Sequence, residues 1–471
     1  MPLDGDDRRP VAVSGLAASR FALDFLRDPL NAARAMTRRH GPFVELTRLV
    51  PFGLSRQTFL LAIGAGFNRA VLGSPAEWRP VRLVPGGPRN SAMRRLAHGI
   101  FRMVGEQHAH YRRLLLPPLR RTAVEAMGPA MIGLAEEEIA GWRPDRPVDL
   151  WADVRQLMRG FAIGLLFGDD RTRGFPIADM IGQVLKLNWS LHVAACPVNL
   201  PFTPYGRMLG LGERLEPKIV EWAGCKRGRP DPGDLLSILA NGPDETGKPT
   251  SDAVLVGHLP SLFAAAYETC QNVLIWTLVL VSLHPEVARD LHAELEGALG
   301  DGPASFEAIA ALPLLDAVVK ESLRMMPPVP VQQRVALADT SLLGHPVRRG
   351  TRVVLSSFLT GRDPALYPDP DCFRPARWAG IDPSAYENPV FSAGPRTCPG
   401  ATFGNSVVKV GAATLLRRWR VAIPAGSRID FKVRLTLNPR DAVPAVLRPV
   451  DGDWRSGPVT GSLNRLVRLP G

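Results

Sequence analysis

Cysteine is scarce in this chain, and its five thiols are scattered along 471 residues. They are Cys196, Cys225, Cys270, Cys372 and Cys398. An odd number of dispersed cysteines, with no C-x-x-C pair and no Cys/His cluster, excludes a disulfide framework and a zinc finger. The pattern predicts a protein of a reducing compartment.

Long apolar runs are also missing. The most apolar stretch, Leu259–Leu283, is interrupted by Glu268, Gln271 and Asn272. Its uncharged part, Val273–Leu283, is about half of the roughly 20 residues that a membrane span requires. We therefore predict a buried core helix rather than a membrane helix.

The charged residues form no long basic block and match no nucleic-acid-binding motif, which disfavours nucleic acid as a ligand. Lys and Arg outnumber Asp and Glu by 57 to 45, and this net charge of +12 suggests an acidic partner or an anionic ligand. Residues 1–19 lack the apolar core of a signal peptide or anchor, so a cytoplasmic protein is predicted.

One short stretch, Phe391–Gly400, carries the clearest chemical signal. Its two glycines and two prolines forbid regular structure, whereas Ala401–Trp419 has the apolar spacing of a helix. Pro399 would then lie in the first turn of that helix. Backbone N–H groups and Arg396 would lower the pKa of Cys398 and make its thiolate a good ligand for iron. The ordinary alternative is a buried structural cysteine in a turn.

This stretch resembles the haem-binding signature of the cytochrome P-450 monooxygenases, F-x-x-G-x-R-x-C-x-G. The matching positions are Phe391, Gly394, Arg396, Cys398 and Gly400. The resemblance implies haem b (iron protoporphyrin IX), with Cys398 as the ligand of the iron. It also implies a mainly α fold with small β-sheets, formed by a single domain over residues 1–471. Residues 1–25 would be an N-terminal extension, and residues 451–471 a C-terminal tail of unclear role.

A second motif lies in the predicted core helix, where Glu268 and Thr269 stand side by side among apolar residues. A buried carboxylate is costly unless it is paired or functional, and an isolated one usually reaches solvent or an ion-pair partner. The segment is similar to the family motif A-G-x-(D/E)-T-T, which implies that Glu268 and Thr269 are catalytic and deliver protons. Ala266 and Cys270 depart from that motif, which puts the opening of the helix and the coupling of electrons to product in doubt.

Basic residues form a third motif. His108 and Arg112 stand four apart in a predicted helix over Gly105–Arg121 and would share one face, as they also would on an ordinary basic surface helix. The resemblance implies that both contact a haem propionate, and that Arg334 is a further propionate partner.

The fourth motif is a charged network. Glu321 and Arg324 share a helical face, and Arg377 follows in Phe373-Arg374-Pro375-Ala376-Arg377-Trp378. An E-x-x-R pair alone is common on surfaces. In the family these residues form a salt-bridge network beneath the haem, and we assign it to folding and haem retention.

The implied reaction is insertion of one oxygen atom from dioxygen into an apolar substrate such as a terpenoid, steroid or fatty acid. Segments 78–103, 262–265 and 329–331 are expected to line the pocket. Electrons would come from a separate acidic ferredoxin or flavodoxin, steered by a basic surface. That surface would consist of Arg112, Arg113, Arg120, Arg121, Lys409, Arg417 and Arg418. A peroxygenase using hydrogen peroxide and a non-catalytic haem gas sensor are the alternatives.

Overall fold

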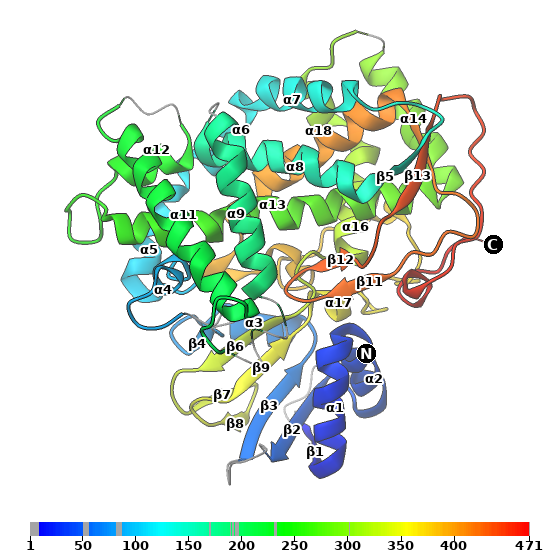
Figure 1. The fold of residues 1–471 in the computed structure, drawn as a ribbon. Helices are drawn as coiled ribbons and strands as arrows, with labels where there is room; N and C mark the ends of the chain where they lie inside the picture. Colours follow the sequence, from blue (N-terminus) through cyan, green and yellow to red (C-terminus); the bar gives the residue numbers. More distant parts are fainter. Residues whose placement is uncertain are drawn as a thin grey trace.

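The computed structural model describes residues 9–49, 56–81, 87–168, 171–188, 190, 193, 197–229, 233–300 and 302–470. Figure 1 shows a large helical body with a smaller β-rich part beside it. The first strands and helices of the chain lie in the β-rich part, and the later helices fill the body.

One long helix, α13 (Asp252–Ser282), runs through the centre of the helical body (Figure 1). It is apolar on all sides over its second half, and every residue from Cys270 to Val281 is buried. A helix that is hydrophobic all round must be enclosed by other elements. By length and composition α13 could cross a membrane, yet two thirds of its most apolar window is buried inside the protein. The predicted core helix is confirmed.

Helices α8 (Leu150–Phe167), α18 (Ala401–Arg418), α16 (Pro313–Met325) and α11 (Pro204–Lys226) pack directly on α13. Further helices complete the body around them. These are α4 (Ala92–Leu96), α5 (Gly105–Leu115), α6 (Arg121–Ala126), α7 (Gly128–Ala140), α9 (Arg171–Asn188), α12 (Leu235–Asn241), α14 (Pro285–Leu299), α15 (Phe306–Ala311) and α17 (Ser357–Thr360). Helices α2 (Pro29–His40) and α3 (Ala65–Leu72) lie beside the strands of the β-rich part.

The main sheet has the strand order β1-β2-β3-β9-β6-β4. Its strands are β1 (Val11–Ser14), β2 (Phe43–Leu49), β3 (Arg56–Ala62), β9 (Arg352–Leu355), β6 (Gln332–Ala336) and β4 (Trp78–Pro80). Two pairs, β1–β2 and β3–β9, are parallel, and the others are antiparallel. Residues 11–25 form β1 and most of α1 (Gly15–Arg27), so this part of the expected extension belongs to the sheet region.

Three small sheets flank this core. They are β10 (Arg420–Ala422), β13 (Pro444–Arg448) and β5 (Pro147–Asp149) in one sheet, then β11 (Phe431–Val433) with β12 (Leu437–Pro439), and β7 (Thr340–Leu342) with β8 (His345–Val347). The Asn438-Pro439 pair is of a kind that often marks a turn, but both residues lie in β12, and the chain turns at residues 434–436 instead.

The C-terminal tail is packed against the rest of the protein. Leu463, Leu466 and Val467 are buried, and the Arg468 amide donates to the carbonyl of Asp371 at 2.8 Å. The residues beyond Asp451, for which the sequence predicted no structure, therefore contribute buried apolar side chains to the core.

Candidate active site

The loop that presents Cys398 is held by one glycine. Gly394 has a φ of 67°, which favours glycine, and a Cβ on it would lie 2.3 Å from the carbonyl oxygen of Leu72. The Thr397 hydroxyl donates to the Gly394 carbonyl at 2.7 Å, and the Cys398 amide donates to the Phe391 carbonyl at 2.8 Å. This glycine of the motif is therefore required by the backbone path of the loop.

The start of the following helix differs from the sequence prediction. Helix α18 begins at Ala401 after Gly400, so Pro399 lies outside its first turn.

Burial raises the pKa of Cys398, although the Gly400 N–H and the charge of Arg112 act in the opposite direction. The expectation of a lowered pKa with Arg396 nearby is wrong for the protein alone, because burial outweighs the positive groups.

A thiol of this kind is deprotonated when it coordinates a metal cation. The Cys398 side chain is enclosed by enough protein to raise its pKa and yet remains accessible from one side, whereas Cys270 on α13 is fully buried. Among the described residues no group of three or more His, Cys, Asp or Glu side chains could hold a metal ion. Cys398 is thus the one exposed thiol among the described residues, and a single thiolate fits a metal that brings its remaining ligands with it, as iron in a porphyrin does.

Four basic side chains gather near this loop: His108 and Arg112 on α5, Arg334 on β6, and Arg396. Burial and the charges of Arg396 and Arg112 together lower the pKa of His108 to about 4, so its imidazole is neutral near pH 7 and the three arginines carry the charge. Burial also lowers the pKa of Arg334 to about 10, with a contribution from the charge of Arg396. These effects on one another's pKa show that the four side chains lie close together. We name them the cation cluster.

The members of the cation cluster have no carboxylate partner among the described residues. Arg334 donates to the Gln333 carbonyl and the Gln332 side chain, and Arg396 donates to the Met103 carbonyl at 2.6 Å. Unpaired cations that are half-buried lose part of their hydration, so a ligand with carboxylates would stabilise this cluster. The two propionates of a haem have that chemistry.

Glu268 and Thr269 lie midway along α13. The Thr269 hydroxyl donates to the Ala265 carbonyl at 2.6 Å, and the helix continues unbroken through Ala266. Burial raises the pKa of Glu268 to about 6. Glu268 has no ion-pair partner within the part of the chain that the structure describes, so the paired alternative finds no support.

Cys270 connects this part of α13 to the loop of Cys398. It is 5% exposed, and its Sγ lies 3.5 Å from where a Cβ on Gly404 of α18 would be. Burial raises the pKa of Cys270 to about 12, and the negative charge of Cys398 acts in the same direction. The thiol that replaces a second hydroxyl therefore packs as a small apolar group between α13 and α18.

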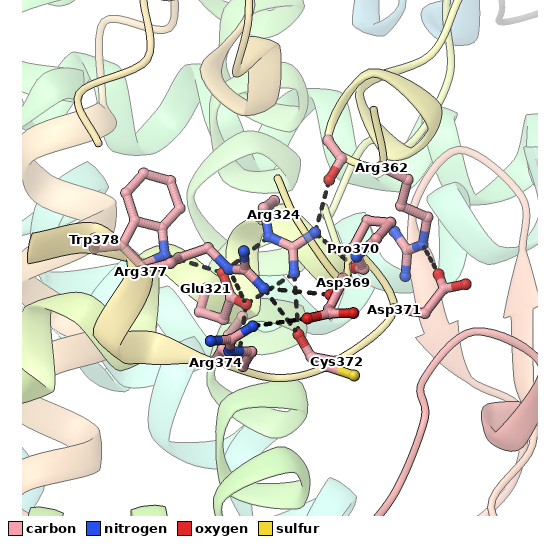
Figure 2. A network of polar contacts seen from close by, with 12 residues as sticks. Glu321, Arg324, Arg362, Asp369, Pro370, Asp371, Cys372, Arg374, Arg377 and Trp378 are labelled. Carbon is pink, nitrogen blue, oxygen red and sulfur yellow. Dashed lines mark hydrogen bonds and ion pairs between the residues drawn. The ribbon is translucent and has the colours of Figure 1, made fainter. Parts of the chain in front are cut away.

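The charged network is formed as the sequence spacing suggested. Figure 2 shows Glu321 at its centre, accepting hydrogen bonds from Arg324, Arg377 and Trp378. The Arg374 amide adds another at 3.0 Å. Arg324 also donates to the carbonyls of Gly361 and Pro370, at 2.7 and 2.8 Å. Glu321 and Arg324 are fully buried.

Two members of this region were not singled out from the sequence. The Trp378 indole donates to Glu321 at 3.0 Å. Arg362 is buried and pairs with Asp371 at 3.0 Å (Figure 2). It also donates to the Leu466 carbonyl at 2.9 Å. A signal existed for Trp378, because it ends the segment Phe373–Trp378, whereas the burial of Arg362 depends on contacts with distant parts of the chain.

The sequence profile of the cytochrome P-450 family matches residues 87–443, which is more than half of the chain. The chain belongs to the cytochrome P-450 family. It is therefore a haem-dependent monooxygenase, and its mainly α fold with small β-sheets is confirmed as the cytochrome P-450 fold.

Among characterised relatives, the cyclooctat-9-en-7-ol 5-monooxygenase of Streptomyces melanosporofaciens is 29% identical over 79% of this cytochrome P-450 and 84% of the relative. The cyclooctatin synthase of the same organism is 26% identical over 91% and 94% of the two chains. A retinoic acid bound cyanobacterial cytochrome P-450 is similar in structure, with a TM-score of 0.77 and 22% identity over 94% of this chain and 99% of that one.

The requirement for glycine at position 394 can be tested in this cytochrome P-450. We expect Gly394→Ala to lower the free energy of unfolding of the haem-free protein by at least about 2 kcal/mol, because of the positive φ and the close Leu72 carbonyl. Urea unfolding followed by circular dichroism measures this.

Gly400→Ala is the matched control. Gly400 has a φ of −94°, and a Cβ there would have no heavy atom within 4 Å. We expect its effect on the haem-free protein to stay within about 0.5 kcal/mol. Equal losses in the two variants would contradict this account of the loop.

Proposed function

We propose that Cys398 ligates the haem iron, and that the cation cluster of His108, Arg112, Arg334 and Arg396 binds the haem propionates. The observation that carries this proposal is an accessible thiol beside three arginines and a neutral histidine that lack carboxylate partners among the described residues. Phe391 and Gly400 would contact the cofactor, since Phe391 anchors the Cys398 amide and Gly400 donates to its sulfur. When bound, haem with a thiolate ligand supplies the oxidation of an unactivated C–H or C=C bond by dioxygen.

We also propose that Glu268 and Thr269 relay protons to the reaction site. Glu268 supports this role because a carboxyl with a pKa of about 6 exchanges protons readily near neutral pH. The Thr269 hydroxyl donates to the Ala265 carbonyl and has only the Cys270 thiol, 4.0 Å away, as a further recorded partner, so its oxygen can accept a hydrogen bond from a stronger donor on the substrate side.

The buried Glu268 carboxylate should reduce stability while it serves the reaction. A folded pKa of about 6 against an ordinary 4.5 means that the native state retains the proton between these values, so stability falls as pH rises through 6. Above pH 6 the ionised Glu268 carboxylate lowers the free energy of unfolding by about 2 kcal/mol, because each pKa unit corresponds to about 1.36 kcal/mol. We expect Glu268→Gln to remove this cost, which is measured by urea unfolding at pH 4.5 and pH 7.5.

Glu268→Gln is also expected to lower turnover about 100-fold, the usual size of a lost proton-transfer group. The gain in stability should appear at pH 7.5 and be nearly absent at pH 4.5. If stability and turnover are both unchanged, Glu268 is an ordinary surface-reaching carboxylate.

The substrate of this enzyme is proposed to be an apolar organic compound of the terpenoid, steroid or fatty-acid kind. Support comes from the apolar residues of segments 262–265 and 329–331, and from relatives whose names concern cyclooctatin and its precursor. The test is a screen of apolar compounds for low-to-high-spin shifts of the Soret band. A screen in which only polar compounds produce the shift would overturn this assignment.

The electron donor is proposed to be an acidic ferredoxin or flavodoxin from the cytoplasm. Arg113, Arg120 and Arg418 are exposed near the C-terminal end of α5 or at the end of α18 and could steer it. Lys409 does not fit this surface, because it is bound to Asp316 and only 12% exposed. Arg112 belongs instead to the cation cluster.

Reversing two of these charges should slow reduction. We expect Arg113→Glu with Arg120→Glu to lower the reduction rate about 10-fold at low ionic strength and to flatten its salt dependence. Stopped-flow reduction by an acidic ferredoxin measures this, with Lys218→Glu on the exposed side of α11 as control. An unchanged salt dependence would place the donor elsewhere.

A further inference from the structure

A cleft of about 1030 Å³ opens at the surface, apart from the loop of Cys398. It is lined by the C-terminal part of α9, the first half of α11 and the segment that leads into α4. Arg434, from the turn between β11 and β12, adds a further lining residue. Segments distant in sequence therefore converge on one cleft.

The walls of the cleft are fixed by packing. A Cβ on Gly206 would lie 1.9 Å from the Leu200 carbonyl, so only glycine lets the segment before α11 fold back onto it. The Thr203 hydroxyl caps α11 by accepting from the Gly206 amide at 3.0 Å, and it donates to the Val198 carbonyl at 2.6 Å. The cleft is thus already formed in the protein by itself.

The charges in the cleft are unbalanced. Lys186, Arg207, Arg214 and Arg434 are all exposed there, and they have no carboxylate partner in the described ranges. The carboxylate of the cleft within those ranges is Glu213, which already accepts a hydrogen bond from the Ala92 amide at 3.1 Å. A cleft with an excess of unpaired cations attracts and holds anions.

Apolar surface lies beside these charges. The apolar residues that line the cleft are Pro88, Leu187, Pro201, Leu209 and Leu211. Apolar side chains that line a cleft can bind the apolar part of a ligand. The combination of cations and apolar surface matches a molecule with an anionic group on an apolar body.

We infer that this cleft selects substrates that carry a carboxylate or phosphate on an apolar body, by binding the anionic group through Arg207, Arg214, Lys186 and Arg434. This inference rests on the proposed function and narrows its substrate class from apolar compounds to anionic amphiphiles. The test compares two probes with the same chain, dodecanoate and dodecan-1-ol, by equilibrium dialysis against the haem-loaded enzyme.

In the unmodified enzyme, dodecanoate should bind about 10-fold more tightly than dodecan-1-ol at low salt, and this preference should shrink as sodium chloride is added. Arg207→Gln with Arg214→Gln should remove most of the preference and leave the affinity for dodecan-1-ol unchanged. Glu213→Gln, whose amide oxygen can still accept from Ala92, should tighten dodecanoate binding about twofold. Lys218→Gln, on the same helix outside the cleft, is the matched control.

Equal affinity for the two probes would overturn the inference. So would the absence of dodecanoate binding up to about 1 mM, or a preference that survives Arg207→Gln with Arg214→Gln. The ferrous carbonyl spectrum of each variant distinguishes a failure of the proposed haem ligand from a failure of the proposed anion-binding cleft. A spectrum without thiolate coordination contradicts the proposed haem ligand, whereas a normal spectrum with no preference contradicts only the assignment of the cleft.

Discussion

Replacing Cys398 by serine is expected to abolish oxygen insertion and to leave the fold intact. The thiolate is the proposed ligand whose electron donation permits cleavage of dioxygen, and a hydroxyl does not replace it. The Gly400 amide, which donates to the sulfur, can donate equally to a serine oxygen, so the loop should keep its shape. The measurement is turnover together with the ferrous carbonyl Soret band.

Cys225→Ser is the control for Cys398→Ser. Cys225 is a free, half-buried thiol on α11, so its removal should change neither the Soret band nor turnover. A Cys398→Ser enzyme that still showed a thiolate-type carbonyl spectrum would refute the assigned ligand. Loss of the same signature in Cys225→Ser would refute it equally.

Replacing Glu321 by alanine is expected to destabilise the protein by about 3–5 kcal/mol, the usual cost of breaking a buried ion pair. Two carboxylate oxygens accept from Arg324, Arg377, Trp378 and the Arg374 amide, and all of these donors would lose their partner. Burial alone would raise the pKa of Glu321, but Arg324 and its other donors bring it below the ordinary value. The network is therefore a charged one at neutral pH.

Urea unfolding and haem content measure the effect of Glu321→Ala. Glu296→Gln, an exposed change on α14, should stay within about 0.5 kcal/mol. Since the folded pKa of Glu321 is lowered, its stabilising effect should be present above its ordinary pKa and be lost as the solution becomes more acidic. A Glu321→Ala protein as stable as the control would show that the network contributes nothing to folding.

Sequence spacing was sufficient to predict the parts of the site that depend on short-range geometry. Glu321 and Arg324 were expected to share a helical face, and they do so in α16 with a separation of 2.8 Å. The central helix was recognised because its interruptions were polar and its uncharged run was too short for a membrane. Fixed motif spacing likewise located the loop of Cys398.

Properties that depend on burial could not be obtained in this way. The pKa of Cys398 was expected to fall because positive groups were visible in the sequence, whereas the burial that raises it was not. Lys409 was expected to face a partner, yet its ammonium group is bound to Asp316 of α16. The error at Lys409 arises from a contact between residues that are far apart in the chain.

The long-range contacts of the tail have a consequence for synthesis of the chain. Arg34, near the beginning, binds Asp371 and donates to the Arg465 carbonyl at 3.0 Å, across 431 positions. During synthesis, Arg34 emerges from the ribosome long before residue 465 has been added, so it cannot reach this acceptor until that distant segment has emerged as well. A product of termination before Arg465 lacks this junction.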